Sequence, residues 1–229
     1  MGQIDTKFIN EKARNKPKVF VETGTFAGGI PQKMLDDGTF SEWDKIYTIE
    51  LNNDMCKVAS NRYSLYEEVG PGKFDRNTDD KDETFDSRKE YFNGKLVLLQ
   101  GDSSNRLRDV IDEVNEPIAF WLDAHAGAKE GYARGEVDCP LINELEAIKS
   151  HSIKNHFIAI DDADLFGKVQ YKDGEVVCDY SDITRERIEK LLLEINPLFT
   201  IEYLTPFGQL MVVASEKNIV KSESGWWAE

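Results

Sequence analysis

The sequence is poor in cysteine and in basic residues, and each shortage excludes a class of protein. Its three cysteines, Cys56, Cys139 and Cys178, form no Cys-x-x-Cys pair, so we expect neither a disulfide framework nor a zinc site. There are 28 Lys and Arg against 43 Asp and Glu, and the net charge of −15 argues against a broad nucleic-acid or anionic-membrane surface. The acidic excess favours cation binding wherever carboxylates converge.

Long apolar runs are also lacking. None approaches the roughly 20 residues that span a bilayer, so no membrane partner is expected. Residues 1–7 lack the apolar core of a secretion signal, and free cysteines fit a reducing compartment. We therefore predict a cytoplasmic protein. With 229 residues and 40% apolar content, the chain suits a single α/β domain over residues 1–229.

Short runs rich in apolar and β-branched residues predict strands that are buried on both faces. These runs lie at residues 18–22, 45–50, 96–100, 118–123 and 157–161. Helical patterns follow them at residues 30–35, 53–63, 103–114, 141–149 and 184–195. The alternation of strand and helix is typical of a parallel sheet with helices on both faces.

The C-terminal part departs from this alternation. Two further strand patterns, 199–204 and 209–214, are separated by only four residues. Parallel neighbours need a long crossover, so this pair predicts an antiparallel hairpin. The fold class predicted is therefore α/β, a Rossmann-like doubly wound sheet of five parallel strands plus the hairpin, with seven strands in all and a core at about residues 17–215.

Two irregular segments interrupt the pattern. Residues 67–91 are polar, and we interpret them as an insertion or a mobile loop. Residues 126–138 contain three glycines and directly follow the fourth strand, where a loop can act as a lid. Near the C-terminus, Trp226 and Trp227 are expected to pack on this domain or on a second copy of it, which leaves a homo-oligomer open.

Ligands of an open α/β sheet bind outside the carboxyl ends of its strands. The first predicted strand ends at Glu22 and leads into a turn with Gly24 and Gly28, where backbone can approach a ligand closely. An ordinary strand-to-helix turn would show the same glycines. Glu50, at the end of the second strand, can accept hydrogen bonds from both hydroxyls of a ribose, or it is solvated surface.

Asp102 and Ser103 follow the third strand. Asp102 is well placed to accept a hydrogen bond from the exocyclic amine of an adenine. Both residues also stand where a helix begins, and either one would be an ordinary N-cap. The sequence leaves these two interpretations open.

Three carboxylates follow the fourth and fifth strands, namely Asp123, Asp161 and Asp162. If those strands are neighbours, the carboxylates meet and repel one another unless a cation lies between them. Oxygen ligands select Mg²⁺, Ca²⁺ or Mn²⁺. The alternative is that these residues cap helices or pair with basic side chains. His125 lies two residues beyond Asp123 and is either a general base or a surface histidine.

The order of these elements resembles the class I S-adenosylmethionine-dependent methyltransferases over about residues 17–215. The resemblance implies that the turn 22–28 holds the methionine part of the cofactor, Glu50 the ribose and Asp102 the adenine. The cofactor contacts expected on this basis are Glu22, Thr23, Gly24, Thr25, Gly28, Glu50, Asp102, Ser103 and Asp123.

A closer likeness is to the metal-dependent O-methyltransferases of the macrocin (sugar) type, which have an Asp-Asp pair after the fifth strand. The likeness implies Mg²⁺ at Asp123, Asp161 and Asp162. The chain departs from the catechol and caffeoyl types, because it has His125 where they have a lysine or a similar base. Residues 67–91 have no counterpart in the family.

The resulting hypothesis is Mg²⁺-dependent methyl transfer from S-adenosylmethionine to a hydroxyl of a sugar or another diol, a small-molecule acceptor. His125 and Asp123 are the predicted catalytic residues. Three alternatives stay open: a methyltransferase without metal, a non-catalytic cofactor-binding protein of the same fold, and a metal-dependent hydrolase.

Overall fold

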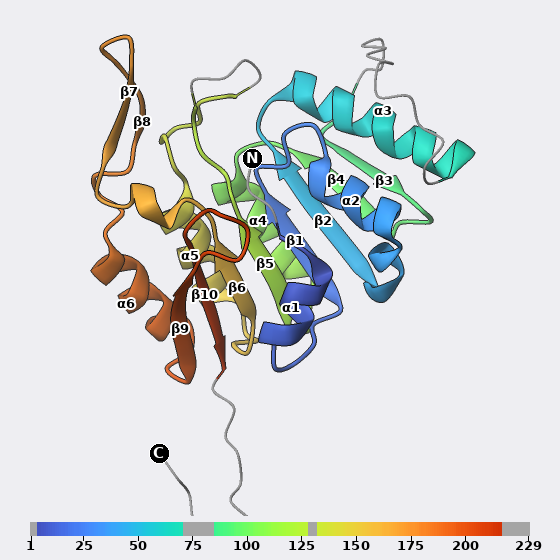
Figure 1. Cartoon of the computed structure of the whole chain (residues 1–229). Coiled ribbons are helices and arrows are strands. Elements are labelled where there is room, and N and C mark those ends of the chain that lie inside the picture. Colours follow the sequence, from blue (N-terminus) through green and yellow to red (C-terminus); the bar gives the residue numbers. More distant parts are fainter. Residues whose placement is uncertain (1–3, 71–84, 128–131, 217–229) are drawn as a thin grey trace, which may run out of the picture.

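The computed structural model describes residues 4–70, 85–127 and 132–216 (Figure 1). An eight-stranded sheet runs in the order β3-β4-β2-β1-β5-β6-β10-β9. Its five parallel strands are β1 (Val19–Thr23), β2 (Lys45–Glu50), β4 (Leu96–Gln100), β5 (Ile118–Leu122) and β6 (Phe157–Ile160). The strand β10 (Met211–Glu216) pairs antiparallel with β6 and with β9 (Phe199–Leu204). The predicted fold class and its terminal hairpin are confirmed.

Helices cover both faces of the sheet (Figure 1). One face carries α1 (Thr6–Lys12), α2 (Gly29–Asp37) and α3 (Asn53–Val69), and the other carries α4 (Ser103–Glu113), α5 (Leu141–Ser150) and α6 (Arg185–Ile195). Successive strand residues point to opposite faces. Phe20 and Trp121 accordingly pack with the first group of helices, and Val21 and Phe120 pack with the second. No described helix is long and apolar enough to cross a bilayer.

The sheet has one strand more than predicted. β3 (Arg88–Tyr91) pairs antiparallel with β4 at the sheet edge, inside the segment interpreted as an insertion. Only Tyr91 of its four residues is buried, so the strand lacks the apolar alternation that predicts one. Charged side chains are typical of edge strands because they discourage pairing with another chain. Residues 67–69 of that segment belong to α3, whereas residues 71–84 and the two tail tryptophans lie outside the described residues.

A second hairpin, β7 (Val169–Lys172) and β8 (Glu175–Asp179), stands away from the main sheet (Figure 1). Its strands are mostly exposed, so they carry little apolar pattern. The connecting Asp173 and Gly174 both have positive φ, at 53° and 86°. An Asp-Gly pair is a strong signal for a two-residue hairpin turn, and it was present in the sequence. Two short 3₁₀ turns, Thr39–Glu42 and Ala163–Leu165, complete the elements.

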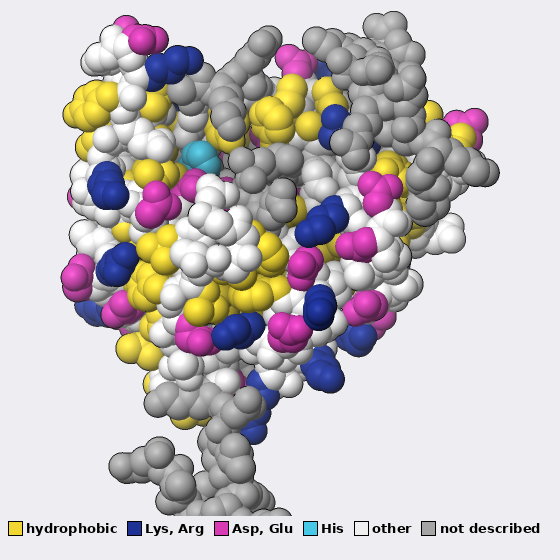
Figure 2. All heavy atoms as spheres, in the orientation of Figure 1, with side chains coloured by type: hydrophobic (Ala, Val, Ile, Leu, Met, Phe, Trp, Pro, Cys, Tyr) yellow, Lys and Arg dark blue, Asp and Glu magenta, His cyan; other side chains and the backbone are white. Residues whose placement is uncertain are grey.

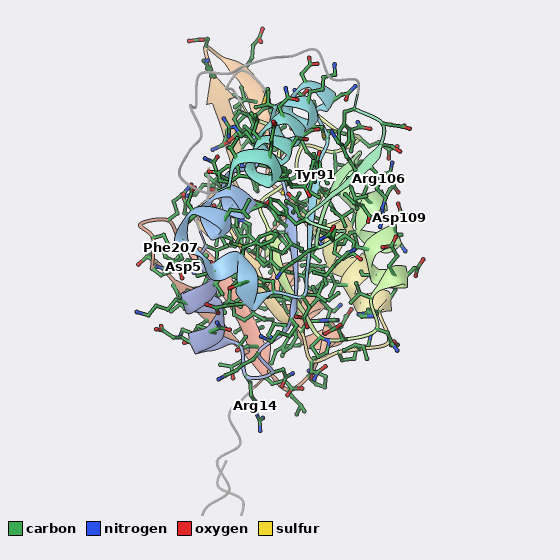
Figure 3. The ribbon with its side chains drawn as sticks, turned by 90° about the vertical axis from the view of Figure 1, so that its right-hand side faces the viewer. Asp5, Arg14, Tyr91, Arg106, Asp109 and Phe207 are labelled. Carbon is green, nitrogen blue, oxygen red and sulfur yellow. The ribbon has the colours of Figure 1, made fainter. Side chains whose placement is uncertain are left out.

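The first helix is joined to the last hairpin of the main sheet. Asp5 caps α1, accepting a hydrogen bond from Phe8 N at 2.7 Å. The Phe8 ring packs edge-on against Phe207 in the β9–β10 turn, with centroids 5.5 Å apart. Figure 3 labels Asp5 and Phe207 on the same side of the molecule. The contact fixes a turn that also carries Gln209, a residue of the site described below.

A pair of buried histidines lies at the opposite edge of the sheet, where β6 begins. Ile118 N donates to His156 Nδ1 at 3.1 Å, and His156 Nε2 lies 3.1 Å from His151 Nδ1. His151 Nε2 lies 2.8 Å from the Val114 carbonyl, to which it donates. Burial lowers the pKa of His156 to about 3, so the pair is neutral. These histidines join two strands and lie far from the strand ends that form the site.

Candidate cofactor and cation site

A pocket of about 580 Å³, including its open mouth, lies at the carboxyl ends of β1, β2, β4 and β5. Five of the predicted cofactor residues line it: Gly24, Glu50, Asp102, Ser103 and Asp123. The other four do not line it. Glu22, Thr23 and Thr25 are buried, and Gly28 is the N-cap of α2. The structure therefore brings the strand ends together as predicted, with part of the glycine turn beneath the pocket.

Gly24 brings the first turn against the end of β5. Its φ is +78°, and a Cβ at this position would lie 2.4 Å from the carbonyl oxygen of Asp123. Only glycine permits both the conformation and the approach. On the other side, the backbone amides of Gly24 and Thr25 donate to the carbonyl of Ile49, at 3.0 and 3.1 Å. The turn is thus held between the ends of β2 and β5.

Glu22 lies beneath the turn with only 3% of its surface exposed. Burial raises its pKa to about 7, although Thr48 Oγ1 donates to its carboxylate at 2.7 Å and lowers it. Gly28, with φ +83°, has a packing role: a Cβ there would lie 2.6 Å from the Tyr63 hydroxyl of α3. The cofactor contacts predicted for these two residues stay predictions.

Glu50 faces the pocket with its carboxylate held by backbone. Phe26 N donates to Oε2 at 2.6 Å, and Asn52 N donates to Oε1 at 2.8 Å. Burial raises the pKa of Glu50, and these hydrogen bonds lower it. Each oxygen keeps a lone pair for a further donor. The carboxylate is therefore oriented to accept two more hydrogen bonds from a ligand.

Asp102 caps a helix and also lines the pocket. Its Oδ1 accepts a hydrogen bond from Ser104 N at 2.9 Å and caps α4. Its Oδ2 faces the loop 126–138, where a Cβ on Gly135 would lie 2.5 Å from it. Asp102 also lines the pocket, so the N-cap and a ligand contact are compatible at this position.

The described part of the loop 126–138 covers one side of the pocket. The Tyr132 ring lies 5.5 Å from the Phe26 ring and 5.5 Å from the His125 ring, centroid to centroid. Arg134 pairs with Asp138 at 3.2 Å and donates to two carbonyls of β8. The sequence indicated a lid here but not that Tyr132 and Phe26 line the pocket, because an aromatic residue in a glycine-rich loop carries no periodic pattern.

A second group of side chains meets at the ends of β5 and β6, which are neighbours in the sheet. Asp123, His125 and Asp162 each offer a ligand atom, and these atoms lie within 4.8 Å of one another. His125 Nε2 is 3.1 Å from Asp162 Oδ2 and 3.8 Å from Asp123 Oδ1. Gln209 Nε2 donates to Asp162 Oδ1 at 3.2 Å. Figure 2 shows a histidine side chain on this face with acidic side chains next to it.

Asp161 does not belong to that group of three, although it lines the same small cavity beside them. Only 5% of its surface is exposed, and neither carboxylate oxygen has a hydrogen-bond partner among the described residues. Burial, followed by the charge of Asp162, raises its pKa to about 6. The predicted metal ligation by Asp161 stays a prediction, and the unpartnered carboxylate is compatible with a nearby cation.

The electrostatics of the group favour a positive charge between the carboxylates. Burial and then the charge of Asp161 raise the pKa of Asp123 well above its usual range. Burial would lower the pKa of His125, but its hydrogen bonds, with that to Asp162 first, raise it to about 10. Without an ion, His125 is therefore protonated at neutral pH and has no lone pair with which to act as a base. Its predicted catalytic function stays a prediction.

Glu144 is a residue of this edge that the sequence reasoning missed. It lies on α5 with 1% of its surface exposed, and its Oε1 has no hydrogen-bond partner in the described structure. Burial raises its pKa to about 7, against the lowering effect of the nearby Ser103 and Thr23 hydroxyls. The helical periodicity of the sequence could have indicated its burial, because Glu144 falls on the same helical face as the buried Leu141, Leu145 and Ile148.

Comparisons with known proteins bear on the fold. Neither a protein-family model nor a curated protein matches the chain. Solved structures do match it. A methyltransferase from Podospora anserina bound to S-adenosylhomocysteine (SAH) has a TM-score of 0.53 and 16% sequence identity, and the match covers 93% of this chain and 76% of that chain. An O-methyltransferase from Bacillus cereus in complex with SAH has a TM-score of 0.55 and 12% identity, covering 93% and 78%. The chain has a Rossmann-like methyltransferase fold.

The methyltransferase fold serves more than one acceptor class among these neighbours. A candidate rRNA methylase from Clostridium thermocellum has a TM-score of 0.52 and 9% identity, covering 94% of this chain and all of that one. At such identities the likeness establishes the fold alone. The acceptor has to be argued from the residues of the site.

Replacing Gly24 with alanine should disrupt the junction between the turn and β5. Gly38→Ala is a matched control, because Gly38 has φ +82° with nothing within 4 Å of an added Cβ. In each variant, an alanine held at positive φ lowers the free energy of unfolding by about 1 kcal/mol. Gly24→Ala adds a clash with backbone, which costs about 1–3 kcal/mol more. Urea unfolding of both variants measures the difference, and equal stabilities would contradict the close approach.

Proposed function

We propose that this chain is an S-adenosylmethionine-dependent O-methyltransferase acting, with a divalent cation, on a hydroxyl of a sugar or another small polyhydroxylated acceptor. One observation carries the proposal. Asp123 lines the pocket that contains Glu50 and Asp102, and it also belongs to the carboxylate–histidine group. His125 lines this pocket as well, so the proposed nucleoside site and the proposed cation site share both Asp123 and His125.

The pocket residues fit the cofactor. Glu50 presents an oriented carboxylate whose free lone pairs suit the two hydroxyls of a ribose. Asp102 has its Oδ2 free of the helix cap and suits the amine of an adenine. The turn at Gly24, pressed against Asp123, would direct the methionine end of the cofactor toward the carboxylate–histidine group. Bound there, the cofactor supplies the methyl group.

The edge residues also fit a divalent cation. The family resemblance implies Mg²⁺ at Asp123, Asp161 and Asp162, and the carboxylate oxygens of Asp161 have no hydrogen-bond partner in the described structure. A cation here would polarise an acceptor hydroxyl. Asp123 and Asp162 would hold it, and Gln209 would keep Asp162 in place. The Tyr132 ring, from the loop 126–138, lies 5.5 Å from the His125 ring.

A small acceptor is favoured over a nucleic acid by charge. The net charge of −15 opposes a polyanion. The acidic residues around the cation site would repel phosphate groups, while the paired oxygens of a diol could reach a cation held by them. The runner-up function is methyl transfer without metal, because His125 can neutralise Asp162 through their 3.1 Å contact in the absence of an ion.

Binding of S-adenosylhomocysteine (SAH) should depend on Glu50. Glu50→Gln places an amide NH₂ against one of two backbone donors and removes the charge, so SAH affinity should fall at least about tenfold. Asp44→Asn, an exposed change just before β2 at the opposite sheet edge, is the control and should bind like wild type. Isothermal titration calorimetry measures both variants. Absence of SAH binding by the wild-type protein would overturn the proposal.

Methyl transfer should require a divalent cation. With labelled S-adenosylmethionine and a panel of sugars and diols, label should pass to an acceptor oxygen. A chelator should then suppress turnover about a hundredfold or more, since a cation contributes several kcal/mol to such steps. Restoring the divalent ion should restore the rate. Undiminished transfer in excess chelator would favour the metal-free alternative, and transfer to RNA alone would contradict the small acceptor.

A further inference from the structure

We propose that the cation site of this chain is a mixed nitrogen–oxygen site, in which His125 Nε2 joins carboxylate oxygens of Asp123 and Asp162 as a ligand. Such a site selects a transition-metal ion, with Mn²⁺ or Fe²⁺ preferred over Mg²⁺. The inference rests on the proposed cation-assisted function and departs from the all-oxygen set that the family resemblance implies.

The separations of the three donor atoms suit a single ion. Two ligands at about 2.1 Å from one ion and at right angles to each other lie about 3.0 Å apart. His125 Nε2 and Asp162 Oδ2 are 3.1 Å apart, and His125 Nε2 and Asp123 Oδ1 are 3.8 Å apart. One ligand atom from each of the three residues lies within 4.8 Å of the other two. Asp161 lies outside this set, so the donors that converge are one nitrogen and two oxygens.

The second ring nitrogen of His125 is positioned as in a metal-bound histidine. His125 Nδ1 lies 2.7 Å from the carbonyl oxygen of its neighbour Ala126 and can only donate to it. A metal-ligating histidine characteristically donates its other N–H to a carbonyl or carboxylate, which fixes the ring and its tautomer. The contact with Ala126 therefore directs Nε2, rather than Nδ1, toward the two aspartates.

Asp162 is held in place from outside the group as well. Gln209, in the β9–β10 turn, donates to Oδ1 at 3.2 Å and leaves Oδ2 facing His125. The Asp162 backbone has φ +54°, a conformation that non-glycine residues rarely adopt. Backbone strain of this kind persists where the surrounding structure enforces it, commonly at functional sites.

Asp161 has a different function in this arrangement. Its carboxylate is nine-tenths buried or more, lines the same small cavity and has no hydrogen-bond partner in the described structure. It contributes negative charge close to the ion without being one of the three converging donors. Imidazole together with carboxylate suits Mn²⁺, Fe²⁺ and the later transition ions, whereas Mg²⁺ takes oxygen ligands and keeps several waters.

The test is pulsed electron paramagnetic resonance on the full-length protein, stripped with a chelator and loaded with Mn²⁺. A directly bound imidazole gives nitrogen modulation of the Mn²⁺ echo, and the wild-type spectrum should show it. Mn²⁺ bound without nitrogen modulation would mean an all-oxygen site and would overturn the inference. Failure to bind Mn²⁺ at millimolar concentration would also overturn it, leaving a hydrogen-bonded triad with a proton in place of the ion.

Variants identify the ligands. His125→Asn should abolish the nitrogen modulation and lower Mn²⁺ affinity in calorimetry by at least about tenfold. Asp162→Asn should lower that affinity as well, whereas Asp161→Asn should keep the nitrogen modulation. Asp164→Asn is the matched control, because it removes an exposed carboxylate two residues from Asp162 and outside the group. Nitrogen modulation that survives in His125→Asn would exclude His125 as the ligand.

The same samples separate this inference from the function on which it rests. Neither the spectrum nor Mn²⁺ calorimetry needs an acceptor or S-adenosylmethionine. Binding of SAH without nitrogen modulation would leave the methyltransferase standing and refute the mixed site. Nitrogen modulation without SAH binding would establish the mixed site and refute the methyltransferase.

Discussion

The contact between the Gly24 turn and the backbone of Asp123 holds the proposed site together. It exists because β1 and β5 are neighbours in the sheet, on either side of the point where the strand order reverses. At that point the chain leaves β1 toward β2 in one direction and reaches β5 in the other. The residues that suit a nucleoside and the residues that suit a cation are thereby brought to the same sheet edge. A side chain at residue 24 would separate them.

A second constraint is the amount of negative charge buried at this edge. Glu22, Glu50, Asp161 and Glu144 are all less than a tenth exposed, and burial raises the pKa of each. Glu50 is compensated by two backbone amides, whereas Asp161 has no hydrogen-bond partner within the described ranges. Buried charges without partners are costly to a fold and are often retained for function. A bound cation would relieve this cost.

Much of the fold could be predicted from the sequence because five strands are apolar on both faces and end in polar residues. Glu50, Asp102 and Asp123 were found by position alone, since parallel strands end at one edge. β3 was missed because its charged residues pair only at the sheet edge, and Glu144 was missed although it falls on the apolar face of its helix. The three aspartates were assigned as one set because they follow the fourth and fifth strands and because the family likeness implies an Asp-Asp pair there. Asp162 has φ +54° and its Oδ2 lies 3.1 Å from His125 Nε2, a contact that no spacing in the sequence reveals.

The most direct test is a crystal structure of the protein with SAH and Mn²⁺. The account predicts SAH in the pocket at the strand ends, with its ribose hydroxyls on the Glu50 carboxylate and its adenine beside Asp102. The sulfur should point toward Asp123, and the ion should lie between Asp123, His125 and Asp162. SAH bound elsewhere, or in this pocket with its sulfur directed away from Asp123, would contradict the account.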